Sequence, residues 1–128
     1  MGCDPPKISG VTRALFDDGH YADAAETAFK AVNMRGKTIW KAAGRPEKDG
    51  KALMLSAFSV NQPTIRLDDL STESGKNIQE GYMHIYAGAI QAIRNPKAHE
   101  IISITPERAL HFLVLASLLM FKLDEAAT

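Results

Sequence analysis

The stretch YADAAETAFKAVNM, residues 21–34, carries the clearest structural signal in the chain. It is rich in alanine, the strongest helix former. Its apolar residues follow helical spacing and form one stripe: Ala24, Ala25, Ala28, Phe29 and Val32. Because alanines on such a stripe let a neighbouring helix approach closely, the segment predicts a core helix. After a break at Gly36, a second helical piece is predicted over 38–43.

Helical signals recur on both sides of this segment. A short helix is predicted up to Phe16, and another over 51–58. The longest is predicted from about Thr72 to Arg94, and the last begins at the cap signal Thr105-Pro106 and runs to about Asp124. The apolar stripe predicted for the longest helix consists of Ile78, Tyr82, Ile85, Tyr86, Ala89 and Ile93.

Strand signals are almost absent. Residues 59–70 lack helical periodicity, and only 64–67 is a candidate for a small extended piece. The sequence therefore predicts an all-α protein, an antiparallel bundle of four to five helices with little or no strand. We expect one helical domain over 8–125, preceded by a linker or the edge of a longer chain over 1–7.

Composition and charge exclude several classes of protein. The chain has 128 residues, of which 45% are hydrophobic and 23% charged, as expected of a folded globular domain. Fifteen basic residues balance fifteen acidic ones, so no global positive field draws the protein onto nucleic acid. The single cysteine, Cys3, allows no intrachain disulfide and suits a cytoplasmic setting. The most apolar run, 109–123, is too short and too polar for a membrane span, so no membrane association is expected.

The longest predicted helix finishes in RNPKAH, residues 94–99. In an unbroken helix, Arg94 and His99 would point about 140° apart. Pro96 removes a backbone donor and clashes with the preceding turn, so we expect the helix to end near Arg94. Asn95 can then cap a fresh turn that begins at Pro96. This bend would bring the guanidinium and the imidazole to one side.

A purely structural explanation of the same residues stands beside this one. Arginine is favoured at a helix C-terminus by the macrodipole, Asn-Pro commonly ends helices, and a single histidine is usually structural. On spacing alone, the structural explanation is the stronger of the two.

A family resemblance changes that balance. Arg94, the polar Asn95 and His99, at the end of a helix in a small all-helical domain, resemble the motif of the HEPN superfamily. That motif is an arginine, a polar residue, and a histidine four to six positions after the arginine. Three blocks in order, GHYADAAETAFKAV, DGKALMLSAF and GAIQAIRNPKAHE, are similar to the Ymh family of bacterial and phage-related proteins, a HEPN-like group. The similarity covers roughly residues 10–123.

The resemblance implies a metal-independent endoribonuclease of a toxin or phage-defence type, with no cofactor. His99 would act as general acid or base, and Arg94 would hold the scissile phosphate. Asn95 would orient the histidine or donate to a phosphate oxygen, with helix capping as its alternative role. Lys97 is the candidate substrate-binding residue, because it lies inside the motif.

The implied partners are RNA and a second copy of the chain. The second copy is implied because the motif has one histidine, whereas the reaction needs both a general acid and a general base. An antitoxin or an upstream domain is a further option. The long helix and the last helix are each apolar over more than one stripe, so either could face the partner copy or lie centrally in the bundle. The rival function is a non-catalytic nucleotide- or protein-binding or dimerisation module. A DNA-binding accessory domain is disfavoured by the zero net charge.

Other candidate residues carry weaker signals. Seven basic residues surround Trp40 and form either a surface that tracks an RNA backbone or an ordinary charged face, and the second is favoured: Lys30, Arg35, Lys37, Lys41, Arg45, Lys48 and Lys51. His20 is expected to be structural, and His84 and His111 show no metal-binding spacing.

Overall fold

The computed structural model describes residues 10–94 and 103–127. These residues form helices and no strand, which confirms the predicted all-α bundle. Within these described ranges, six elements follow one another: α1 (Val11–Asp17), α2 (Tyr21–Ala42), α3 (Gly50–Ala57), α4 (Glu73–Ala89), the π-helical turn η1 (Ile90–Arg94) and α6 (Pro106–Ala127).

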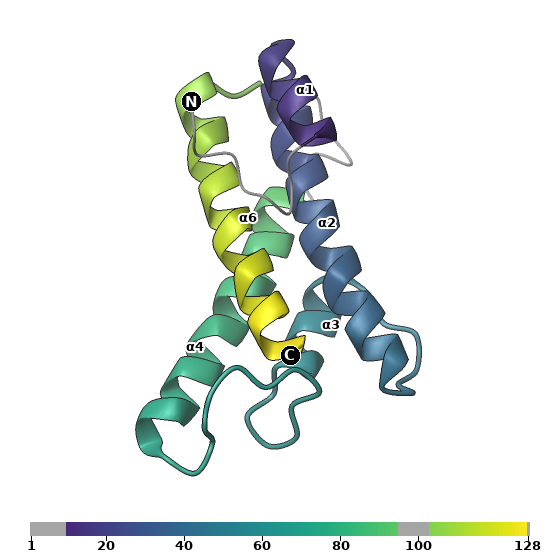
Figure 1. The fold of residues 1–128 in the computed structure, drawn as a ribbon, viewed down its shortest axis with the longest axis vertical. Coiled ribbons are helices and arrows are strands. Elements are labelled where there is room, and N and C mark those ends of the chain that lie inside the picture. Colours follow the sequence, from purple (N-terminus) through teal and green to yellow (C-terminus); the bar gives the residue numbers. More distant parts are fainter. Residues whose placement is uncertain (1–9, 95–102, 128) are drawn as a thin grey trace.

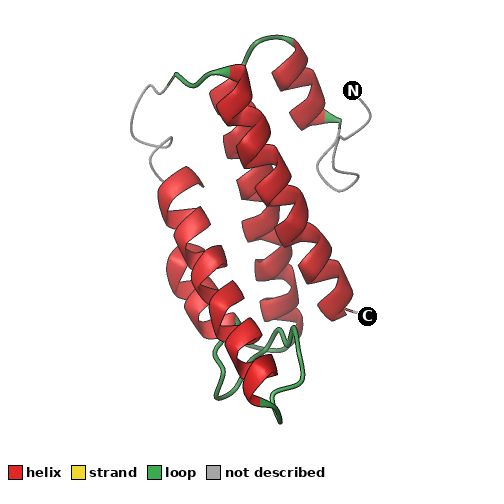
Figure 2. Cartoon of the chain, turned by 90° about the vertical axis from the view of Figure 1, so that its left-hand side faces the viewer, coloured by secondary structure: helices red, strands yellow, loops and turns green. Residues whose placement is uncertain are grey.

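Two long helices, α2 and α6, lie side by side and run in the same direction (Figure 1). The third long helix, α4, runs the opposite way and continues into η1, which contacts α2. The short α1 folds back along the first half of α2, and α3 packs between α2 and α4. Figure 2 shows the loops that connect α1 to α2, α2 to α3 and α3 to α4.

Helix α2 is continuous, so the predicted break at Gly36 is wrong. A glycine in a helix interior costs about 1 kcal/mol relative to alanine, which good helix formers and burial on either side can offset. Gly36 is buried, and a Cβ atom there would lie 3.3 Å from Cε of Met54. The glycine therefore allows α3 to approach α2 closely and does not interrupt the helix.

The predicted cap signals are confirmed at both long helices that follow. Thr72 Oγ1 accepts a hydrogen bond from the amide of Gly75 at 3.0 Å, at the start of α4. Thr105 Oγ1 accepts one from the amide of Arg108 at 3.1 Å, before Pro106 opens α6. Each side chain satisfies a backbone donor that the first turn of a helix leaves without an intrahelical partner.

The segment between α3 and α4 contains no strand, so the extended piece predicted over 64–67 is wrong. Its backbone bonds to other elements instead of to a strand partner. The amides of Thr64 and Ile65 both donate to the carbonyl oxygen of Ala57, at 2.9 Å each. The segment is thus held at the C-terminal end of α3.

The fully buried side chain of Gln79 on α4 completes this attachment. Its Nε2 donates to the carbonyl oxygens of Phe58 and Ile65, both at 2.9 Å, and its Oε1 accepts from the amide of Leu67 at 2.8 Å. One amide side chain therefore satisfies three backbone groups of a segment that has no ladder of its own.

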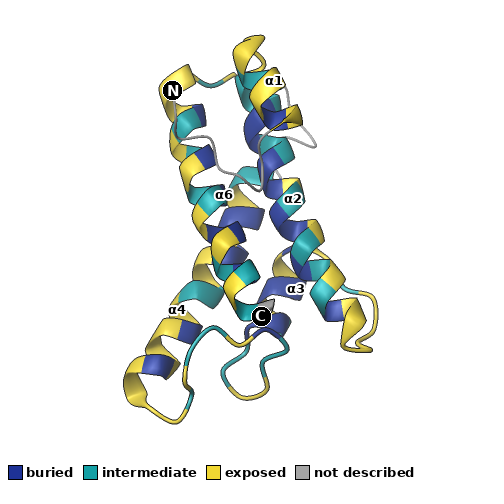
Figure 3. Ribbon diagram, in the orientation of Figure 1, coloured by how far each residue is buried: buried dark blue, intermediate teal, exposed yellow. Residues whose placement is uncertain are grey.

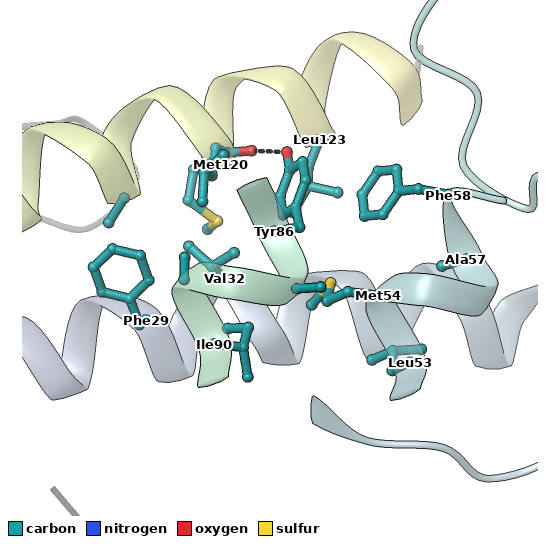
Figure 4. Close-up of a cluster of buried hydrophobic side chains, with 14 of the residues drawn as sticks. Phe29, Val32, Leu53, Met54, Ala57, Phe58, Tyr86, Ile90, Met120 and Leu123 are labelled. Atoms are coloured by element: carbon teal, nitrogen blue, oxygen red, sulfur yellow. Dashed lines mark hydrogen bonds between the residues drawn. The ribbon is translucent and has the colours of Figure 1, made fainter. Parts of the chain in front are cut away.

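The core lies where α2, α3, α4 and α6 meet (Figure 3). Tyr86 is fully buried there, stacks on Phe58 with ring centroids 4.3 Å apart, and donates its hydroxyl hydrogen to the carbonyl oxygen of Leu119 (Figure 4). Burial raises the pKa of Tyr86 well above its ordinary value, so the hydroxyl remains a donor. The ring thereby joins α4 to both α3 and α6.

The stripe predicted for α2 is buried throughout, whereas the stripe predicted for α4 is only partly correct. Of its members, Tyr86 and Ala89 are buried and Tyr82 and Ile93 are partly buried, but Ile78 and Ile85 are 37% and 43% exposed. The buried face of α4 is therefore narrower than the sequence indicates, because Ile78 and Ile85 lie at its edges while Gln79 and Tyr86 lie at its centre.

Replacing Gln79 tests how strongly the irregular segment depends on it. We expect Gln79→Leu to lower the free energy of unfolding by about 2 to 4 kcal/mol, because the volume is kept while two carbonyls and one amide lose their partner. Urea denaturation measures the change. The neighbouring exposed Glu80→Ala is the control, expected within about 0.5 kcal/mol of wild type, and an equally small change for Gln79→Leu would contradict the assignment.

Candidate functional site

Of the four residues predicted for the site, one, Arg94, lies within the part of the chain that the structure describes. Arg94 is the last residue of η1, and its side chain is 20% exposed. Asn95, Lys97 and His99 lie outside the described residues, and so does the bend predicted at Pro96. The proximity of Arg94 and His99 therefore stays a prediction.

The α-helix that leads to Arg94 becomes a π-helical turn over its last five residues. This helical path runs from Glu73 without interruption, as predicted, and the turn has the sequence IQAIR. Such turns, with hydrogen bonds from residue i to i+5, are rare and are often found at functional sites. Ile90 is fully buried at the start of this turn, and Ile93 packs against the core. The arginine is thus attached to a turn that is anchored from the inside.

The guanidinium of Arg94 lies against the start of α3. Its Nη1 is 3.5 Å from Oδ1 of Asp49, the residue that precedes α3. A Cβ atom on Gly50 would lie 3.1 Å from Nη2 of Arg94, which is closer than most real contacts. Gly50 also has a φ of +64°, a backbone conformation that favours glycine. The absence of a side chain at this position leaves room for the guanidinium.

A buried asparagine on α2 holds the carboxylate that faces Arg94. Asn33 is 5% exposed, and its Nδ2 donates to Oδ1 of Asp49 at 2.7 Å. Its Oδ1 accepts a hydrogen bond from the amide of Gly50 at 3.2 Å. The side chain of Asn33 therefore joins the middle of α2 to the first residue of α3. We call Asn33, Asp49, Gly50 and Arg94 the Arg94 cluster.

The charge of Asp49 is stabilised by its neighbours. The hydrogen bond from Asn33 holds the pKa of Asp49 below its ordinary value, partial burial acts in the opposite direction, and the charges of Arg94 and Lys37 lower the pKa further. Lys37 Nζ lies 3.9 Å from Oδ1 of Asp49. The carboxylate is therefore ionised at neutral pH beside two cations.

Neither Asn33 nor Asp49 was predicted as a site residue. The available signal for Asn33 was its position one turn after Phe29, on the apolar stripe of α2. A polar side chain on a buried face needs a hydrogen-bonding partner, so it points to a second polar group nearby. The identity of that group depends on a contact between residues 16 positions apart.

The basic residues around Trp40 do not form a stacking surface for bases. Trp40 is 5% exposed, its Nε1 donates to the carbonyl oxygen of Pro46, and Arg45 and Lys48 lie over its ring, each 5.6 Å from the centroid. A buried ring shielded by cations cannot stack on RNA bases.

Several of the neighbouring cations have acidic partners. Lys37 and Lys41 lie 3.0 and 3.8 Å from the carboxylate oxygens of Glu47. Arg35 lies 3.5 Å from Oδ1 of Asp124. The structure thus favours an ordinary charged face here, which was the preferred explanation of this stretch.

The three histidines within the described ranges are exposed and separate from the Arg94 cluster. His20 precedes α2, His84 lies on α4 and His111 on α6. Within residues 10–94 and 103–127, no three His, Cys, Asp or Glu residues are grouped so that they could hold a metal ion. None of the described helices combines the length and apolar character that crossing a membrane requires.

The chain is an all-α bundle in which the buried side-chain amide of Asn33 holds the carboxylate of Asp49, and this carboxylate faces Arg94. The chain belongs to the family described as "Protein of unknown function (Hypoth_ymh)", whose family model matches residues 5–123. This confirms the predicted Ymh resemblance, while the wider HEPN assignment stays a prediction. Comparison with curated proteins gave no match, and comparison with solved structures gave none.

The low pKa of Asp49 predicts a pH-dependent contribution to stability. A carboxylate whose folded pKa is depressed stabilises the fold above its unfolded pKa of about 4, and this contribution is lost as pH falls through the folded value. We therefore expect Asp49→Asn to be less stable than wild type at pH 7, with a difference that narrows below about pH 4. Thermal unfolding between pH 3 and 7 measures this, with Asp18→Asn as the control for loss of an exposed carboxylate. A difference that stays constant over this range would show that the ionised carboxylate is not the stabilising group.

Proposed function

We propose that this chain is a metal-independent endoribonuclease whose site is built around Arg94 and His99. The observation that carries the proposal is the Arg94 cluster: the arginine of the motif ends a π-helical turn and is supported by a carboxylate that a buried amide holds. An arginine that only ended a helix would need no such support. The resemblance of RNPKAH to the HEPN motif supplies the reaction class.

RNA carries its own nucleophile, so the reaction needs proton transfer and charge stabilisation only. His99 takes the proton of the 2′-hydroxyl, whose oxygen attacks the neighbouring phosphorus. The bond from phosphorus to the 5′-oxygen breaks, and that oxygen receives a proton. The products are a 2′,3′-cyclic phosphate and a 5′-hydroxyl. Arg94 binds the phosphate and stabilises its added negative charge in the transition state.

The remaining motif residues have supporting roles in the proposal. Asn95 orients the imidazole of His99 or donates to a phosphate oxygen, and Lys97 binds a phosphate of the RNA strand. Because the net charge of the chain is zero, these local contacts must supply the attraction for RNA.

A second copy of the chain completes the site by bringing a second His99 as the proton donor. Two features of the described surface support a homodimer. Apolar side chains at helical spacing are exposed on α6, namely Val114, Leu118 and Phe121, with exposed fractions of 61%, 43% and 44%. On α4, Ile78 and Ile85 lie within one turn of Tyr82, over whose ring Lys122 of α6 is placed at 4.9 Å. The exposed apolar residues of both helices therefore lie beside the Tyr82–Lys122 contact between α4 and α6. We call this surface the α4–α6 seam.

The proposed setting is a bacterial or phage-related toxin or defence system in the cytoplasm, in which an antitoxin or an upstream domain would restrain the nuclease. The support for this setting is the resemblance of RNPKAH to the HEPN motif. The second candidate function is a non-catalytic nucleotide- or protein-binding module. The offset of part of the Arg94 charge by Asp49 suits the protein-binding form of this alternative, because a protein partner does not require the positive charge that a phosphate needs.

Cleavage of RNA by the purified full chain tests the proposal. In buffer with EDTA, we expect cleavage of single-stranded RNA to a cyclic phosphate and a 5′-hydroxyl. His99→Ala should reduce the rate about 100-fold or more, since it removes the general acid and base. Arg94→Ala should reduce it by about 100- to 1,000-fold, as for loss of a transition-state donor. Arg66→Ala, an exposed arginine in the α3–α4 segment, is the matched control.

The outcomes separate the two candidate functions. Activity that persists in His99→Ala would remove the proposed site, and a requirement for a divalent metal would contradict the mechanism. If wild type cleaves no RNA but binds nucleotides or a protein through the same residues, the binding module is the function.

The dimer is tested by placing a charge on the α4–α6 seam. We expect Phe121→Glu to convert the dimer into a monomer and to lower RNA cleavage at low protein concentration, because a buried unpaired charge opposes association. Light scattering during size-exclusion chromatography measures the mass. Val11→Glu, which charges an equally apolar and 69% exposed site on α1, is the control. A wild-type chain that is monomeric at all concentrations would contradict the composite site.

A further inference from the structure

The Arg94 cluster joins three elements that are distant in sequence. The arginine ends η1, Asp49 and Gly50 begin α3, and Asn33 lies in the middle of α2. These three elements contact one another pairwise. The position of the guanidinium therefore depends on how α2, α3 and η1 pack.

Asp49 does not do what an aspartate at this position ordinarily does. It occupies the N-cap of α3 in an extended conformation, from which a carboxylate usually accepts a hydrogen bond from the first turn. Its side chain makes no such cap bond. The carboxylate instead accepts from Asn33 at 2.7 Å and lies 3.5 Å from Nη1 of Arg94. Its carboxylate is therefore directed mainly at Asn33 and Arg94, with a smaller contribution from the amide of Gly50.

Asn33 fixes the carboxylate in that orientation. The side chain is buried, and both ends of its amide are engaged, one by Asp49 and the other by the amide of Gly50. A rotation of the Asn33 side chain would break both bonds inside the protein, where an unpaired polar group is costly. The buried amide of Asn33 therefore holds Oδ1 of Asp49, the oxygen that faces Nη1 of Arg94.

We propose that Asp49 and Asn33 are positioning residues that orient the Arg94 guanidinium for the bound RNA phosphate. This inference rests on the proposed ribonuclease function. Asp49 binds one side of the guanidinium through Nη1, and Asn33 holds Asp49. Neither residue contacts the RNA. A guanidinium that is oriented before the phosphate arrives needs less reorganisation in the transition state, and small misplacements of a catalytic group are costly.

Kinetics of Asp49→Asn provide the first test. The substitution keeps the shape of the side chain and removes its charge. We expect kcat for a mixed-sequence single-stranded RNA oligonucleotide to fall about 10- to 100-fold, with a smaller change in KM. Glu47→Gln is the matched control, because Glu47 lies in the same loop and pairs with Lys37 and Lys41. It should retain wild-type kcat. Circular dichroism checks that each variant is folded.

A double-mutant cycle asks whether Asp49 acts through Arg94. Arg94→Lys keeps the charge but removes the planar fork that Asp49 holds. If Asp49 only positions this fork, adding Asp49→Asn to Arg94→Lys should cost less than threefold in kcat. Two losses that multiply would show that Asp49 acts on something other than Arg94, and this would overturn the proposal.

The side-chain Nε–Hε resonance of Arg94 provides a readout that does not depend on RNA. Its NMR signal is assigned by its loss in Arg94→Lys. We expect Asp49→Asn and Asn33→Ala to shift this signal and to speed its hydrogen exchange, while Glu47→Gln leaves it unchanged. An unshifted signal in Asp49→Asn, or a wild-type kcat in that variant, overturns the positioning role.

RNA cleavage by wild type and by Asp49→Asn distinguishes loss of the positioning role from loss of the ribonuclease function. If wild type cleaves RNA and Asp49→Asn is equally active, the positioning role falls and the ribonuclease stands. If wild type cleaves no RNA, the ribonuclease falls and takes the positioning role with it, even where the NMR signal shows that Asp49 orders the arginine.

Discussion

The side-chain amide of Asn33 is the interaction on which the arrangement around Arg94 depends. It sits in the middle of the most strongly predicted helix, yet it is used for a contact between helices. By bonding the carboxylate of Asp49 and the backbone of Gly50, it sets where α3 begins relative to α2. Because η1 packs against both of these helices, the same amide sets where the guanidinium of Arg94 can lie. One buried polar group thus links the packing of the bundle to its candidate site.

A second buried amide, Gln79, does comparable work at the other end of α3. The segment between α3 and α4 has no regular ladder, and its backbone groups near the core need partners within the protein. Gln79 satisfies three of them from α4, and the amides of Thr64 and Ile65 bond the end of α3. Both ends of α3 are therefore fixed by side-chain amides of neighbouring helices. The short helix is thus held both by these bonds and by its buried side chains Leu53, Met54 and Ala57.

The electrostatics of the chain are local. Positive charges on α2 and in the following loop have acidic partners or lie over Trp40, so this face offers no broad basic surface. What distinguishes Arg94 from these cations is not the presence of a carboxylate but the way that carboxylate is held. The half-exposed Asp49 receives a short hydrogen bond from the buried Asn33, whereas the more exposed Glu47 pairs with the side chains of Lys37 and Lys41. A surface ion pair contributes little to stability, but a carboxylate that is hydrogen-bonded to a buried amide can orient the guanidinium beside it.

Local patterns in the sequence determined the helices, their caps and the apolar stripe of α2, because helix propensity, capping and 3.6-residue periodicity act over neighbouring residues. They also indicated that the helical path beginning near Thr72 reaches Arg94, although this path was expected to be the longest helix and α4 is shorter than α2 and α6. They failed at Gly36, at 64–67 and at Ile78 and Ile85, where burial and close contact with another element decide the outcome. Only the tertiary structure decided that Asn33, Asp49 and Arg94 meet, because these residues are 16 and 45 positions apart and the contacts between them exist only once three helices have packed.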